Sequence, residues 1–488
     1  MGNYKIKDKR LYDATKKFTY LVGGMLEKDV KSGRIPEYIK LAFQIVGDLS
    51  SLEGDKQLYL IKRSPYYEFF YKNIGELEAS GEFRTLVSII DKNETIKSHL
   101  DKYVGTAEYK SLISLRHSFL TSTVLPVLTK SDIIQSGVFT FNDEVFDNAY
   151  IKNEQFFYSK DLQFKERVII YNFKLDSEEI LLDNGIQIRK LLEEEQKDFD
   201  IYHYDLFLNH LVTQNAGLCE IYKIFETKKV IDSSMQLKFH RSSEEQKQRN
   251  DILKQVLTTI EALELFTRGS IGRLFVDSVP LNNPFWEYNI PSTYNFHGDW
   301  VDKEKIYQFK TSEVRLFNDF LKLYERAKTF NEFNVALSRL KAGRMREDPI
   351  DRIIDDVIAF DSILGGGGRA IAQRAAVLIT NNEKTQGKIV NILHQAYEKF
   401  RSKILHGGEA EKITIDGEEV NQVELADLTQ ELLRISLKCY MALKVSNSEK
   451  NIRQLLDNAL FDSDIANNVR KIAGPYLKNE IYFNQEAL

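Results

Sequence analysis

The sequence predicts an α+β protein that is predominantly helical, with a mixed α/β N-terminal region followed by an antiparallel helical bundle. Three observations lead to this prediction. At 488 residues the chain is longer than one ordinary domain. Its middle part holds short segments rich in aromatic and β-branched residues, which favour strands. Its last part holds apolar-periodic segments bounded by capping residues and glycines, which favour a helical bundle.

The composition is that of a globular protein. Hydrophobic residues make up 43% and charged residues 28% of the chain, and no apolar run approaches the roughly 18 residues that a membrane helix needs. Cys219 and Cys439 lack metal-ligand spacing, so we expect two buried thiols in a reducing compartment. The first residues contain no apolar signal segment. We therefore expect a cytoplasmic protein without a membrane partner.

The charge balance limits how the chain can bind nucleic acid. A net charge of −5 argues against a protein that coats nucleic acid nonspecifically, because such binding depends on neutralising many phosphates. An enzyme that binds RNA at one local site remains compatible with this charge.

Residues 1–130 are predicted to be mainly helical, for example around 36–49 and 111–128. Residues 131–342 are predicted to be a mixed α+β region with a sensor or regulatory role. The elements expected in it are strands at 137–141, 155–159 and 166–175, a turn at 183–185 followed by a helix over 186–196, helices over 242–266 and 312–342, and an irregular stretch over 269–300.

Residues 343–488 are predicted to be the bundle. Asp348 is placed to cap a helix that begins at Pro349 and ends before the glycines at 365–368. Those glycines fit an inter-helix loop better than a phosphate-binding loop, because no Lys-Ser/Thr pair follows them. The further elements expected are helices over 369–380, 385–406 and 421–444, a hairpin over 413–420, and two shorter helices at the end.

The third helix of this bundle carries Arg401 and His406, separated by four residues. Arg401 falls on one helix face with Tyr397 and His394, whereas a separate stripe of Ile389, Leu393, Ala396, Phe400 and Ile404 supplies the core face. On a straight α-helix Arg401 and His406 point about 140° apart. A common site would therefore need the end of the helix, the long reach of Arg401, or a second subunit.

These two residue types suit cleavage of RNA through its own 2′-hydroxyl. Arg401 stays charged and offers a fork of donors that matches phosphate. His406 lies in the last turn of the helix, where the dipole favours an imidazolium that can donate a proton. The alternative is that Arg401 pairs with acidic neighbours and His406 is a polar residue at a helix end.

Four stretches in order resemble the Apea-like HEPN family over about residues 349–445. They are IAFDSIL at 358–364, RAIAQRAAVLI at 369–379, AYEKFRSKILHGG at 396–408, and the closing amphipathic helix. The resemblance implies a HEPN bundle that forms a homodimer, in which two Arg-x4-His motifs face one cleft and cleave an RNA substrate without a metal or other cofactor.

Members of that family are often toxins or anti-phage abortive-infection effectors, so the N-terminal region would restrain the enzyme or respond to a phage-derived or other trigger. The rival hypothesis is a catalytically silent HEPN bundle that serves dimerisation or protein binding. The presence of both Arg401 and His406 favours the enzyme. Where the family usually has Glu in its first-helix motif, this chain has Asp361.

Four further residues are candidates for supporting roles. Asp361 lies on an apolar stripe and needs a partner, for which Arg374 and Arg401 are the candidates; it would orient the active site or form a structural ion pair. Tyr397 and Ser402 could contact substrate phosphate or serve only packing and solvation.

Arg344 and Arg346 belong to a basic run just before the bundle. They could guide RNA to the cleft or form a solvated helix end. No His, Cys or carboxylate pattern predicts a metal site.

Overall fold

The computed structural model describes residues 4–34, 43–46, 57–62, 65–103, 112–192, 218–228, 243–281, 292–296, 306–402, 413–415, 417–447 and 451–477. Contacts between Cα atoms divide the chain into two compact units. Unit 1 comprises Met1–Val168, Tyr222–Lys254 and Phe275–His297, and unit 2 comprises Ile169–Ile221, Gln255–Leu274 and Gly298–Leu488. The three regions drawn from the sequence stay a prediction.

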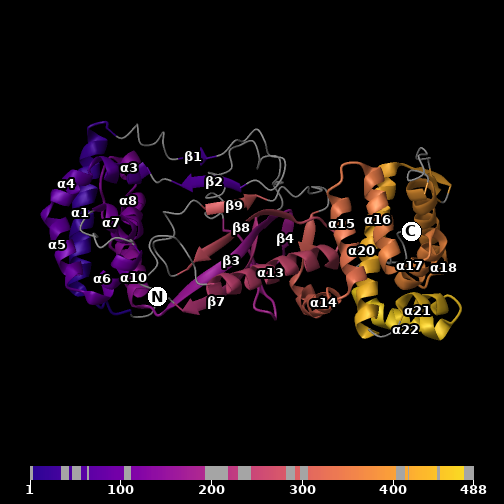
Figure 1. Ribbon diagram of the computed structural model, residues 1–488. Helices are drawn as coiled ribbons and strands as arrows, with labels where there is room; N and C mark the ends of the chain where they lie inside the picture. The colour runs from indigo at the N-terminus through magenta and orange to yellow at the C-terminus, as the bar shows by residue number, and fades with distance from the viewer. Residues whose placement is uncertain are drawn as a thin grey trace. The chain divides into compact units, whose positions relative to one another are not determined.

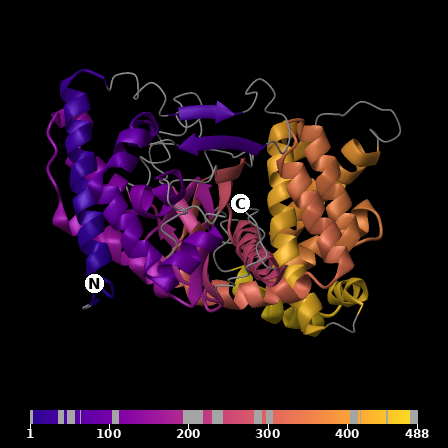
Figure 2. The same ribbon diagram turned by 60° about the vertical axis from the view of Figure 1, so that its left-hand side comes forward.

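The N-terminal helices belong to unit 1 and gather in one group in both views (Figure 1 and Figure 2). They are α1 Lys9–Lys31, α3 Pro65–Lys72, α4 Ile74–Ala79, α5 Gly81–Asp91, α6 Glu94–Tyr103, α7 Leu112–Leu115, the π-helix η2 Arg116–Val124, α8 Leu125–Ser131, α9 Ile133–Ser136 and α10 Asp143–Tyr158. The helical prediction for 111–128 is confirmed over its described residues.

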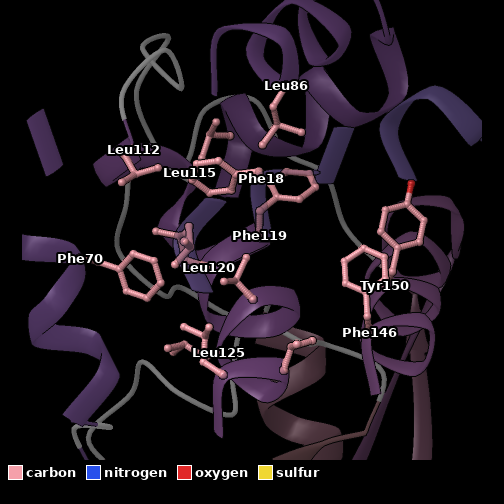
Figure 3. Close-up of a cluster of buried hydrophobic side chains, with 14 of the residues drawn as sticks. Phe18, Phe70, Leu86, Leu112, Leu115, Phe119, Leu120, Leu125, Phe146 and Tyr150 are labelled. Carbon is pink, nitrogen blue, oxygen red and sulfur yellow. The ribbon is translucent and has the colours of Figure 1, made fainter. Parts of the chain in front are cut away.

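One apolar cluster holds these helices together (Figure 3). Phe18 of α1, Leu86 of α5 and Phe119 of η2 are each at most 1% exposed. Phe146 and Tyr150 of α10 add a stacked pair with ring centroids 6.1 Å apart. Because each of these helices buries only one face, the cluster supplies the stabilisation that the short helices lack alone.

An eight-stranded sheet has the order β1-β2-β9-β8-β3-β7-β6-β5. Its strands are β1 Phe43–Val46, β2 Gln57–Lys62, β3 Asp161–Tyr171, β5 Glu179–Leu181, β6 Gln187–Lys190, β7 Cys219–Lys228, β8 Gly272–Pro280 and β9 Ser292–Phe296. The pairs β1–β2, β2–β9, β8–β9 and β5–β6 are antiparallel. Two smaller pairs are parallel β4 Phe173–Leu175 with β10 Tyr307–Phe309, and antiparallel β11 Ile413–Ile415 with β12 Glu418–Val420.

Several local predictions in the first 300 residues are wrong. The segment 155–159 is not a strand, because its first four residues complete helix α10, where Phe156 and Phe157 fill the core. Residues 137–141 form no strand, and Phe141 stacks on Tyr20 with centroids 4.1 Å apart. Phe43–Val46, expected to be helical, pairs with β2.

Pairing between strands explains two more differences. The helix expected over 186–196 begins instead as strand β6, because Ile188 pairs with the buried Ile180 across the turn at 183–185. The stretch 269–300, expected to be irregular, supplies β8 and β9. The strand over 166–175 and the hairpin at 413–420 are confirmed in their described residues.

Three helices lead from the sheet to the bundle: α13 Ser243–Phe266, α14 Val314–Ala327 and α15 Asn331–Arg344. The single helix expected over 312–342 is thus wrong, because the chain turns at 328–330. The turn is fixed by Asn334, whose Nδ2 donates to the carbonyl of Lys328 at 2.7 Å. The rings of Tyr324 and Phe333 then pack edge to face.

The C-terminal helices pack as a bundle (Figure 2). Its members are α16 Pro349–Ile363, α17 Gly368–Ile379, α18 Glu383–Gln395 with the π-helix η4 Ala396–Ser402, α20 Gln422–Ser446, α21 Ile452–Ala459 and α22 Ser463–Ala473. Asp348 caps α16 as expected, accepting from the N–H of Ile350 at 2.7 Å. The predominantly helical α+β class is therefore confirmed.

Both cysteines are buried and free, as expected, and burial raises the pKa of the Cys219 thiol to about 12. Within the described parts of the chain, no helix has both the length and the apolar character that a bilayer crossing requires.

A buried carboxyl lies between α16 and α20. Asp356 is 0% exposed; its Oδ2 accepts from Thr429 at 3.1 Å, and its Oδ1 has no hydrogen-bond partner among the described residues. Burial raises the pKa of Asp356 well above its usual value, although Thr429, Arg352 and Arg344 oppose this. The folded protein therefore binds this proton more tightly than the unfolded chain does.

We predict that Asp356→Asn stabilises the protein increasingly as the pH rises. The contribution of Asp356 to stability is fully present below its unfolded pKa of about 4 and is lost as the pH rises through the higher folded pKa. The melting temperature of the variant relative to wild type should therefore increase by a few °C, roughly, between pH 4 and pH 8. The exposed Asp351→Asn on the same helix serves as control. A difference that does not change with pH would contradict the burial argument.

Candidate functional site

The predicted catalytic pair lies at the end of α18 and beyond it. Arg401 and Ser402 belong to the π-helix η4, whose backbone is described there. Their side chains and the whole of His406 lie outside the described residues. The pairing of Arg401 with His406 therefore stays a prediction, and so does a phosphate contact by Ser402.

The core face of this helix is confirmed where it is described. Ile389, Leu393 and Ala396 are each at most 3% exposed. On the other side, His394 is half-buried, and its Nδ1 has no hydrogen-bond partner among the described residues. The helix thus presents its apolar stripe to the bundle, as the sequence predicted.

The π-helix η4 contains the first residue of the motif, Arg401, and ends one residue after it. In a π-helix the N–H of residue i+5 donates to the carbonyl of residue i, so each turn is wider than a turn of α-helix. Tyr397 and Ser402 have this spacing within η4. Because η4 ends at Ser402, it does not set the angle between Arg401 and His406, which is about 140° on a straight α-helix; residues 403–406 lie outside the described residues. The homodimer, for which this angle is an argument, stays a prediction.

Tyr397 packs directly on the start of α17. A Cβ built on Gly368 would lie 2.7 Å from Cδ1 of Tyr397, so only glycine allows this approach without a shift. Packing is thus one role of Tyr397, beside the phosphate contact considered from the sequence. The contact joins η4 to the loop of four glycines.

That loop links α16 to α17, as expected from the sequence, and Arg374 holds it. Gly365, Gly366 and Gly367 all have positive φ, which favours glycine. Arg374 donates through Nη1 to the carbonyls of Leu364 and Gly365, both at 2.6 Å. These are carbonyls at the end of a helix, which have no partner within it.

Arg374 also forms a two-point ion pair with Asp457 of α21, with both N···O distances 2.7 Å. This pairing lowers the pKa of Asp457. The sequence suggested Arg374 as a partner for Asp361; the structure shows its fork on Asp457. Asp361 itself is half-buried on α16, and its backbone carbonyl accepts from Arg453 at 3.4 Å. Arg374 thus acts as a link between α16, α17 and α21.

The basic run before the bundle has intramolecular partners. Arg346 is exposed and its Nε donates to Asp355 at 3.2 Å, which Arg339 also binds. Arg344 donates to the carbonyl of Glu264 at 3.2 Å. Burial lowers the pKa of the Arg344 guanidinium, although nearby Glu264 opposes this. Arg344 is thus half-buried and bound to the end of α13, and its predicted contact with RNA would compete with α13.

Sequence reasoning missed a second polar site in unit 2. A cavity of about 190 Å³ lies between the end of α13, the end of α15, the start of α16 and the middle of α20. Arg434 lines it and is only 1% exposed. The signal available was a pair of cations, Arg434 and Lys438, on a helix whose other residues over 432–443 are apolar apart from Ser436 and the hydroxyl of Tyr440.

Among the described residues, no group of three or more His, Cys, Asp or Glu side chains is arranged to hold a metal ion. Compared with models of known families, with curated proteins and with solved structures, the chain has no match in any of the three searches.

We predict that Gly368→Ala destabilises the protein by about 1–3 kcal/mol, because its methyl group overlaps the Tyr397 ring. Tyr397→Ala should remove most of this penalty in the double variant, giving a coupling energy in a double-mutant cycle. The control is Gly387→Ala in α18, where nothing lies within 4 Å, so that higher helix propensity should stabilise it slightly. Equal melting temperatures for Gly368→Ala and Gly387→Ala would refute the contact.

Proposed function

We propose that the chain is a HEPN-type endoribonuclease that cleaves RNA without a metal ion, through Arg401 and His406. The observation that carries the proposal is the Arg-x4-His spacing, whose Arg401 lies in a π-helix, Ala396–Ser402, that continues a helix of the bundle. Short π-helical segments are frequent at functional sites, where they reposition side chains.

The chemistry follows from the two residue types. The 2′-hydroxyl loses its proton and its oxygen attacks the adjacent phosphorus, while the bond to the 5′-oxygen breaks and that oxygen takes up a proton. Arg401 stabilises the charge on the non-bridging oxygens, and His406 transfers a proton. The products are a 2′,3′-cyclic phosphate and a 5′-hydroxyl.

The surrounding contacts support a rigid site. Tyr397 on Gly368 fixes η4 against α17, and Arg374 fixes the loop between α16 and α17. A site held by packed residues keeps its geometry better than one on free loops. In this proposal the enzyme works as a homodimer in the cytoplasm, as a toxin or anti-phage effector whose N-terminal region responds to a trigger.

The second candidate is a catalytically silent bundle of the same type that serves dimerisation or protein binding. One observation favours it: both arginines proposed to guide RNA, Arg344 and Arg346, bind groups within the chain. The two candidates differ in whether purified protein cuts RNA at all.

We predict that Arg401→Ala and His406→Ala each reduce RNA cleavage on the order of 100-fold or more, because one loses charge stabilisation and the other proton transfer. Arg401→Lys should be impaired as well, since it keeps the charge but loses the fork. The exposed Arg369→Ala on α17 is the matched control. Full activity of folded His406→Ala would remove the catalytic assignment, and inactivity of wild type with an intact dimer would support the silent bundle.

Cleavage should also persist in EDTA and leave 2′,3′-cyclic phosphate and 5′-hydroxyl ends, because the proposed transfer uses only the RNA hydroxyl, Arg401 and His406. Sequencing of RNA ends with and without phosphatase treatment measures this. Strict dependence on added Mg²⁺ or Mn²⁺, or 5′-phosphate products, would rule out this mechanism.

A further inference from the structure

The cavity in unit 2 is lined mainly by charged side chains, and cations outnumber anions. Its basic residues are Arg268, Arg273, Lys341, Arg344, Arg352 and Arg434. Its acidic residues are Glu261, Glu264, Asp427 and Glu431. The lining thus has an excess of two positive charges, whereas the whole chain has a net charge of −5. A local reversal of sign in a concave, partly buried place favours an anion.

The four carboxylates pair with cations, but the lining still has an excess of two positive charges. Arg352 binds Asp427 at 2.6 Å, and Arg434 binds Glu431 at 2.7 Å. Lys341 binds Glu261, which Lys328 also contacts. Nη1 of Arg344 lies 3.9 Å from the carboxylate Oε2 of Glu264, at the limit of an ion pair.

Two buried donors at the cavity lack acceptors. Nε2 of Gln430 and Nε of Arg352 have no hydrogen-bond partner among the described residues, and both residues line the cavity. A buried N–H without an acceptor is unfavourable and rare in folded proteins. Both groups can only donate, so the partner they call for is an acceptor, and the charge excess makes that acceptor an anion.

The other walls of the cavity are apolar. Leu257 and Ile260 of α13 and Ile271 after it contribute to the lining. Met345, which is 64% exposed, also borders the cavity. A ligand that fills this space therefore has a charged end and an uncharged organic part.

We propose that this cavity binds a small phosphate monoester, with the phosphate among the arginines and Gln430 and the organic group against the apolar wall. A phosphate monoester carries close to two negative charges at neutral pH, which matches the charge excess. Arginine forks match its oxygens in geometry. The proposal concerns a site apart from Arg401 and His406 and does not depend on ribonuclease activity.

The test is isothermal titration of the full-length protein with adenosine monophosphate, with inorganic phosphate and with adenosine, at constant ionic strength. Adenosine monophosphate should bind saturably and raise the melting temperature, inorganic phosphate should bind more weakly, and adenosine should not bind. Gln430→Glu places a carboxylate of nearly the same shape in the cavity and should weaken binding on the order of tenfold or more. Gln422→Glu, exposed on the same helix, makes the same charge change outside the cavity and should bind as wild type.

Arg268→Gln provides a second variant if Gln430→Glu does not fold, because Arg268 is exposed at the lining. It should weaken binding, whereas Arg326→Gln, exposed on α14, should not. Lack of saturable binding of both phosphate compounds at millimolar concentration would overturn the proposal. Equal affinity of wild type and folded cavity variants, or binding of adenosine as tight as that of its monophosphate, would overturn it as well. None of these measurements involves RNA, so they are independent of the ribonuclease proposal.

Discussion

The arrangement of unit 2 depends on the C-terminal end of α13, which lies inside the protein and whose carbonyls need partners there. The last carbonyls of a helix have no partner within it and carry its negative dipole end. Here the carbonyls of Glu264, Leu265 and Phe266 accept from Arg344, Arg434 and Lys438 at 3.2, 3.0 and 2.5 Å. Three cations from α15 and α20 thus replace the water that an exposed helix end would bind.

The turn before this end is held in the same way. Glu261 accepts from Tyr324 at 3.0 Å and from Lys328 at 2.7 Å, and it also pairs with Lys341. Burial raises the pKa of Glu261, but the two lysines outweigh this and lower it to about 2. The stability that Glu261 contributes is therefore present at neutral pH and is lost only as the pH falls from about 4 towards 2. These contacts fix the last two turns of α13 to α14, α15 and α20, and they set where the bundle begins.

How much the sequence could predict depends on how local each signal is. Asp348 before Pro349, and Asn421 with Glu424, are complete caps within four residues, and both helices begin where these caps place them. Strand β6 forms because Ile188 pairs with Ile180, and Phe156 is helical because it fills a core built from distant helices. In both segments the neighbouring residues alone give a misleading signal. The Arg401-x4-His406 spacing is also local and could be found, whereas the π-helix that carries Arg401 could not. The cavity brings the end of α13 together with α15 and α20, which lie about 80 and 170 residues further along the chain. No periodicity in the sequence reveals such a site.

The cations that cap α13 also explain why the cavity would select its ligand by charge. Arg344 and Arg434 serve the helix end and the cavity together, so an anion shares them with carbonyls and with Glu431. A singly charged ion gains little over these existing acceptors, whereas a doubly charged phosphate gains more from the same donors. The acidic remainder of the chain repels anions, but salt screens this repulsion beyond about 10 Å. The cations of the cavity attract a bound anion at contact distance. Selection for a dianion therefore follows from the same buried cations that end α13.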